Sequence, residues 1–129
     1  MNINQQTETF IISAQSKALA TYGENLNVVP LSSVKIVNGK IWLVNYFMDK
    51  TLLNILANPS VSLVCWSEMI GFQIKGTVVY YTNGDDFESA VAWIHSILPD
   101  RVVNGLLVLT PKEIFDIAPT KNTKEKIKW

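Results

Sequence analysis

Apolar and polar residues alternate with a period of two along much of the chain, which is the pattern of half-buried β-strands. The alternation is clearest at residues 72–81, where Phe72 and Ile74 fall on one face and Gln73 and Lys75 on the other. Other segments are dense in apolar and β-branched residues and are also predicted strands: residues 17–22, 27–37, 40–46, 60–66, 105–109 and 113–117. The chain is therefore predicted to be rich in β-structure.

Helical spacing of apolar residues marks three further segments. Residues 85–98 carry apolar side chains at offsets 0, 3, 4, 7, 10 and 11, and Pro99 closes the segment. Residues 49–58 start at Asp49, a good N-cap residue, and run into Pro59, which cannot continue a helix. Residues 4–14 form a shorter predicted helix at the start of the chain.

The Asn38-Gly39 pair is the strongest hairpin signal in the sequence and predicts a type I′ turn between two strands. A two-residue turn fixes the register of the strands that it joins. The predicted pairs are Val37 with Lys40, Ile36 with Ile41, Val34 with Leu43 and Ser32 with Asn45. The inner face is apolar near the turn and ends in the polar pair.

About six strands with two or three short helices predict a mainly β protein of the α+β class with a barrel-like sheet. A chain of 129 residues with an apolar fraction of 48% can fill one hydrophobic core. We therefore expect one domain over residues 1–119, followed by a lysine-rich tail at residues 120–129 without a core pattern.

Charge and cysteine content narrow the function. The formal net charge is zero and Arg101 is the only arginine, which leaves no basic face for nucleic acid. One cysteine, Cys65, and one histidine, His95, exclude an internal disulfide and metal sites built from several imidazoles. Cys65 lies within an apolar strand and is interpreted as a core residue. Without a signal-peptide pattern or a membrane-length apolar run, the protein is expected to be cytoplasmic.

The polar pair at the end of the predicted hairpin, Ser32 and Asn45, is one candidate for a ligand contact. Buried polar groups are costly unless something hydrogen-bonds them. The pair therefore faces either a ligand at the mouth of the barrel or water at its rim, and the hairpin alone does not decide between the two.

The start of the predicted 49–58 helix is a second candidate. Free backbone N–H groups at a helix start attract anions, Lys50 adds positive charge there, and Thr51 adds a hydroxyl donor. These features suit a phosphate group, although a lysine beside a threonine is also common on ordinary surfaces. Asp49 would repel a phosphate unless its side chain turns inward to cap the helix.

The order of these segments resembles the FMN-binding split-barrel superfamily, which includes pyridoxamine 5′-phosphate oxidases and small FMN-binding proteins. The resemblance spans roughly residues 17–117 and lies in order and spacing rather than in any single motif. Its parts are Asn27-Val28-Val29-Pro30-Leu31-Ser32-Ser33, the hairpin, Lys50-Thr51 opening a helix that ends at Asn58-Pro59, the strand at residues 61–66, and Phe72-Gln73-Ile74-Lys75-Gly76. It implies a split β-barrel homodimer with FMN at the subunit interface.

Carried over by position, the resemblance implies a set of cofactor contacts. Lys50 and Thr51 would hold the FMN phosphate, residues 29–32 would run along the flavin and ribityl chain, and Asn45 would close the pocket. The full set is Val29, Pro30, Leu31, Ser32, Asn45, Asp49, Lys50 and Thr51.

The expected function is that of an FMN-binding flavoprotein, an oxidoreductase or electron-transfer protein. Pyridoxamine phosphate oxidases hold their substrate partly with an arginine and a histidine near the C-terminus, and residues 120–129 contain neither. This departure argues against true pyridoxamine 5′-phosphate oxidase activity. Two alternatives remain open: a non-redox module for flavin, haem or another phosphorylated ligand, and a structural homodimer that has lost its cofactor.

Overall fold

The computed structural model describes residues 3–119, so the predicted tail at residues 120–129 lies outside the described residues. The elements in chain order are α1 (Gln5–Ser13), β1 (Ser16–Tyr22), β2 (Leu26–Pro30), β3 (Val34–Val37), β4 (Lys40–Asn45), α2 (Asp49–Ala57), β5 (Ser60–Ser67), β6 (Ile70–Tyr81), α3 (Asp85–Ile97) and β7 (Gly105–Asp116).

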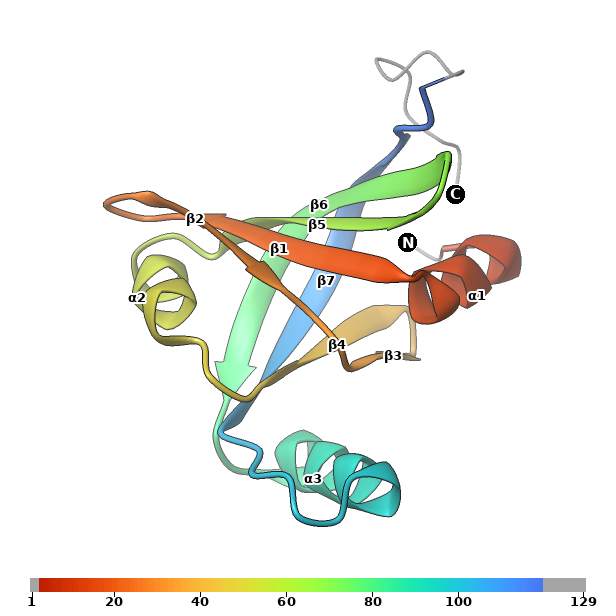
Figure 1. Cartoon of the computed structure of the whole chain (residues 1–129). Helices are drawn as coiled ribbons and strands as arrows, with labels where there is room; N and C mark the ends of the chain where they lie inside the picture. Colours follow the sequence, from red (N-terminus) through yellow and green to blue (C-terminus); the bar gives the residue numbers. More distant parts are fainter. Residues whose placement is uncertain (1–2, 120–129) are drawn as a thin grey trace.

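The strands form one antiparallel sheet in the order β2-β1-β5-β6-β7-β4-β3. Helix α1 contacts both β3 and β5, which three other strands separate in that order, so the sheet curls round to bring them close. Figure 1 shows this curl, with α2 beside β1 and β2 and with α3 at the end of the molecule opposite the β5–β6 turn. The mainly β class with three helices is confirmed, with seven strands instead of about six.

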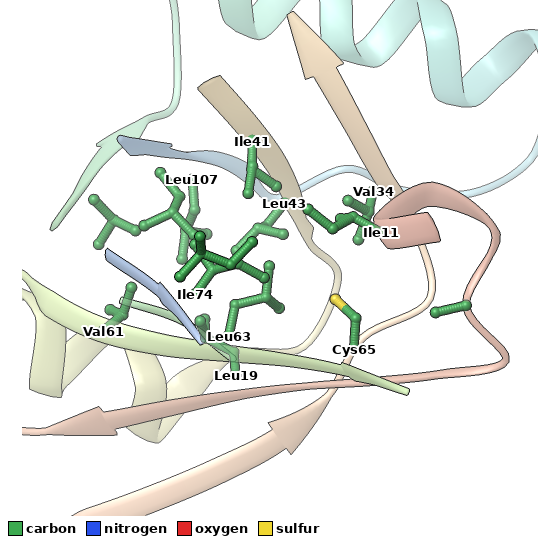
Figure 2. Packing of buried hydrophobic residues seen from close by; sticks show 14 of the residues in the cluster. Ile11, Leu19, Val34, Ile41, Leu43, Val61, Leu63, Cys65, Ile74 and Leu107 are labelled. Carbon is green, nitrogen blue, oxygen red and sulfur yellow. The ribbon is translucent and has the colours of Figure 1, made fainter. Parts of the chain in front are cut away.

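The core lies inside the curled sheet, where the inward-facing side chains of its strands meet (Figure 2). Leu19 of β1, Leu43 of β4, Leu63 of β5 and Ile74 of β6 are completely buried there. Cys65 belongs to the same cluster, which confirms its interpretation as a core residue. Alternation along each strand thus places one apolar face in this interior.

The predicted hairpin turn is confirmed. Asn38 and Gly39 have φ angles of 51° and 75°, the positive values that a type I′ turn requires at both central residues. The register between β3 and β4 follows the prediction from the turn as far as Val34, which pairs with Leu43.

The predicted pairing of Ser32 with Asn45 is wrong. Strand β3 begins at Val34, and Asn45 pairs instead with Gly105 of β7. The predicted single strand at residues 27–37 is two strands, because the chain leaves β1 after Pro30 and crosses to the far edge of the sheet, beside β4.

The last strand differs from its prediction in the opposite way. Residues 105–109 and 113–117 were predicted as two strands, but Gly105–Asp116 is continuous. Pro111 lies inside it, opposite an irregularity in β6 between Lys75 and Gly76. A proline lacks a backbone donor and is accommodated in a sheet at such a bulge.

Helices α2 and α3 cover different parts of the sheet. Ala90 of α3 packs with Trp42, Leu106 and Val108 in a second, smaller apolar cluster outside the barrel interior. Helix α2 contacts β1 and β2. Its N-cap residue is Met48, which makes no side-chain capping hydrogen bond, so the predicted N-cap role of Asp49 is wrong.

Candidate cofactor site

A cavity of about 260 Å³ lies where the end of β2 approaches the segment that follows β4. Residues 29–32 form one wall, and Val44 with residues 46–48 forms the other. Half of the predicted site, namely Val29, Pro30, Leu31 and Ser32, is therefore brought together at one cavity. Ser32 is exposed at this position.

Asn45 holds the turn from β4 into α2. Its side chain is only 2% exposed. The Oδ1 atom accepts a hydrogen bond from the backbone N–H of Met48 at 2.7 Å, and the Nδ2 atom donates to the hydroxyl of Tyr80 at 2.9 Å. Both ends of the amide have internal partners, so Asn45 does not meet water at a rim, which was one of the two possibilities that the sequence left open.

The segment before β7 is tied to the same turn. The Tyr80 hydroxyl donates to the backbone carbonyl of Asn104 at 3.2 Å, and the Asn104 backbone N–H donates to the carbonyl of Asn45 at 2.9 Å. The Asn104 side chain also donates to the carbonyl of Tyr46. Gly105 leaves the space that the Tyr80 hydroxyl and ring occupy, because a Cβ atom there would overlap them. These contacts fix the backbone on either side of Tyr46.

Lys50 and Thr51 have very different surroundings. Thr51 is fully buried, and its hydroxyl accepts a hydrogen bond from Nδ2 of Asn27 at 3.0 Å. Lys50 is exposed and borders a separate cavity of about 430 Å³ between α2 and the β1–β2 turn. The predicted site residues therefore fall into three groups: the wall at residues 29–32, the buried Asn45 and Thr51, and the exposed start of α2.

The start of α2 carries groups that attract an anion and one group that repels it. The N–H groups in the first turn of a helix have no partner within the helix, and Met48 offers them no capping side chain. The helix dipole and Lys50 both favour an anion there. Asp49 is exposed on the same turn without capping the helix, so its negative charge offsets part of this attraction.

Sequence reasoning did not single out Tyr46 and Phe47, which form part of the cavity wall. Phe47 is 87% exposed, and the Tyr46 hydroxyl lies 2.7 Å from Oγ of Ser33. The guanidinium carbon of Arg101 lies 4.8 Å from the centroid of the Tyr46 ring. The sequence did contain a signal for these cavity residues, namely two aromatic residues between the end of a strand and the start of a helix, outside any core pattern.

Other chemically active groups lie away from this cavity. Burial raises the pKa of the Cys65 thiol to about 12, despite the opposing effect of the Lys17 charge. The Nε2 atom of the exposed His95 is hydrogen-bonded to the carbonyl of Arg101 at 2.9 Å.

Across residues 3–119, no cluster of three or more histidine, cysteine or acidic residues is arranged to hold a metal ion. In the same range no helix has the length and apolar character needed to span a membrane.

Comparison with known proteins supports the resemblance seen in the sequence. The family model described as pyridoxamine 5′-phosphate oxidase matches residues 3–123. MJ0282, an uncharacterized protein of Methanocaldococcus jannaschii, is 32% identical over 95 residues. That match covers 70% of this chain and 64% of the relative, so the chain spans less than two thirds of the relative's length.

Several solved structures share the fold at low sequence identity. HupZ from Group A Streptococcus has a TM-score of 0.82 and 19% identity, covering 93% of this chain and 98% of HupZ. An FMN-binding protein from Syntrophomonas wolfei has a TM-score of 0.76 and 13% identity, covering 91% of this chain and 90% of that protein. HutZ, described as a heme storage protein from Vibrio cholerae, has a TM-score of 0.68 and 13% identity, covering 89% and 94%.

The family match and the fold agree. The matched residues include every strand and every helix described above. The chain therefore belongs to the pyridoxamine 5′-phosphate oxidase family and has its FMN-binding split-barrel fold.

Proposed function

We propose that this protein is a homodimeric flavoprotein that binds FMN against residues 29–32 and the start of α2, and uses it in electron transfer or in the reduction of a small molecule. One observation carries the proposal. In a chain of this family, the cavity at residues 29–32 is bordered by Met48, the N-cap residue of α2 that offers no capping side chain, and Lys50 follows within the first turn of the helix.

The residues present suit the two halves of FMN. The free amides of the first turn and the Lys50 ammonium favour a phosphate. Val29 and Leu31, facing Tyr46 and Phe47 across the cavity, provide apolar and aromatic surface for a flavin ring. Bound FMN would supply the redox chemistry, while this chain orients the ring and excludes water from it.

A second copy of the chain would complete the site. A cavity of about 260 Å³ is smaller than the usual range of about 300–1,000 Å³ for small-molecule sites. At the start of β2 and on α2 the chain exposes an apolar patch, which we call the β2–α2 patch and define as Leu26, Leu53 and Leu56, with exposed fractions of 82%, 70% and 80%. Exposed apolar clusters mark interaction sites, and this one adjoins the proposed phosphate contact at Lys50.

The proposal is tested by titrating FMN into the purified protein and following flavin fluorescence and absorbance. Saturable binding is expected, with Lys50→Ala weakening it by about 1.5–3 kcal/mol, or about 10- to 150-fold in Kd. Lys40→Ala is the matched control, because Lys40 is an exposed lysine at the other end of β4, about 17 Å along the strand from Asn45. Failure to take up FMN, or equal effects of the two substitutions, refutes the phosphate assignment.

Two related functions give different results in the same assay. Bleaching of bound flavin by NADH or NADPH without oxygen supports a redox role, whereas stable colour with both supports a non-redox flavin module. The heme storage description of HutZ favours a haem module as the second candidate. Its histidine ligand would have to be His95, which is on α3 and is not part of the wall of the 260 Å³ cavity. Preferential binding of hemin over FMN would support that candidate.

A further inference from the structure

A third cavity, larger than the two described above, is also lined by Tyr46 and Phe47. Its volume is about 680 Å³, within the usual range of about 300–1,000 Å³ for small-molecule sites. Phe47, Leu98, Pro99 and Val102 give it a mostly apolar wall. Arg101, the only arginine of the chain, contributes the one cationic side chain to this wall.

Arg101 is held in place by its surroundings. Its guanidinium carbon lies over the Tyr46 ring, 4.8 Å from the ring centroid, and its backbone N–H donates to the carbonyl of Leu98 at 3.1 Å. The Arg101 carbonyl contacts Nε2 of His95, and the Tyr46 hydroxyl is bonded to Ser33. A cation positioned over an aromatic ring loses less conformational freedom when it binds a ligand.

Arg101 is exposed, and no described residue takes up the hydrogen-bonding capacity of its guanidinium. Among residues 3–119, its N–H groups have neither a hydrogen-bond acceptor nor a carboxylate partner. A guanidinium carries five N–H donors in a planar fork that matches a carboxylate or a phosphate. The contact with the Tyr46 ring positions the guanidinium of Arg101 and leaves these donors for a ligand.

We propose that the 680 Å³ cavity binds a small molecule with one anionic group on an apolar body, and that Arg101 holds the anionic group. This inference rests on the proposed function, since Tyr46 and Phe47 line both cavities and would place the molecule beside the flavin as its substrate. The substrate of the proposed flavoprotein would then be a small molecule with one anionic group on an apolar body.

Asp100 indicates which anion the cavity prefers. Its side chain lines the same cavity and does not pair with Arg101. A carboxylate at the wall repels a negatively charged ligand, and the energetic cost grows with the charge of the ligand. A singly charged carboxylate therefore fits the cavity better than a doubly charged phosphate.

The test uses three probes of similar size: benzoate, phenyl phosphate and the neutral benzamide. Each is titrated calorimetrically into FMN-free and FMN-loaded protein. Benzoate is expected to bind saturably, more tightly than phenyl phosphate, and at least about tenfold more weakly to Arg101→Gln. Benzamide affinity should be the same in both proteins. Lys40→Gln removes a positive charge elsewhere and controls for net charge.

Arg101→Lys serves as the second variant, because it keeps the charge and loses the planar fork. It should bind benzoate with intermediate affinity, and circular dichroism verifies that both variants fold. In FMN-loaded protein, benzoate should shift the flavin absorbance, and Arg101→Gln should abolish the shift at the same benzoate concentration.

The inference is overturned if benzoate does not bind, if Arg101→Gln leaves its affinity unchanged, or if Lys50→Gln rather than Arg101→Gln removes binding. A protein that takes up FMN but shows one of these results refutes the substrate site and keeps the proposed function. A protein that binds benzoate through Arg101 but takes up no FMN refutes the proposed function and keeps the anion site.

Discussion

Replacement of Asn45 by alanine tests the hydrogen bonds that hold the turn between β4 and α2, on which the candidate site depends. The amide accepts the Met48 backbone N–H at 2.7 Å and donates to the Tyr80 hydroxyl at 2.9 Å, and it is almost completely buried. Met48 is buried too, at 7% exposure, so its N–H loses its acceptor without easy access to water.

The magnitude follows from these two hydrogen bonds. A buried donor left without a partner costs about 1–3 kcal/mol, and loss of the second hydrogen bond costs about 1 kcal/mol. The Tyr80 hydroxyl still donates to Asn104, which keeps the second cost small. We expect Asn45→Ala to lower the free energy of unfolding by about 2–4 kcal/mol.

Urea unfolding followed by circular dichroism measures this change, at one fixed protein concentration because the stability of the proposed dimer would depend on concentration. Asn83→Ala is the matched control, because Asn83 is an exposed asparagine before α3 that forms no side-chain hydrogen bond in the described part of the chain. A double-mutant cycle with Tyr80→Phe should give a coupling of about 1 kcal/mol between Asn45 and Tyr80.

The reasoning is refuted if Asn45→Ala costs less than about 1 kcal/mol, or no more than the Asn83 control. A coupling near zero would show that the Tyr80 hydrogen bond does not stabilise the turn into α2, whatever the cost of the single substitution.

Four further predictions follow from the exposure, burial and packing of single residues. If the proposed dimer forms through the β2–α2 patch, Leu56→Lys should shift gel filtration from dimer to monomer, whereas Ile97→Lys, at an exposed apolar position of α3, should not. Because burial raises the pKa of Cys65 from 9.0 to about 12, a thiol reagent at about pH 8 should modify it only in unfolded protein. Its neutral thiol also contributes stability below pH 9 that is lost as the pH rises towards 12, which urea unfolding at several pH values will detect. Gly105→Ala should destabilise the fold by about 1–3 kcal/mol, since the new methyl group overlaps Tyr80, and unchanged urea unfolding would contradict this.

Local chemistry determined several features before any tertiary structure was known. Asn38 and Gly39 tolerate positive φ angles, so the turn and the register near it followed from two residues. Alternation and dense apolar, β-branched segments identified most of the strands, and Pro59 and Pro99 marked the ends of two helices. The order of these segments also indicated the family, which the match over residues 3–123 confirmed.

Tertiary structure decided the rest. The chain turns between Pro30 and Val34 because β3 pairs with β4 at the far edge of the sheet, and no local pattern encodes that edge. The partners of Asn45 are Met48, close in sequence, and Tyr80, which only the sheet brings near.

The sequence by itself thus determined most of the elements, the hairpin and the family of this protein, because each depends on neighbouring residues or on their order. Only the fold decided that Thr51 is buried while Lys50 is exposed, and that Arg101 lies over the Tyr46 ring beside a cavity. Those placements depend on contacts between residues far apart in the chain, which side-chain periodicity does not record.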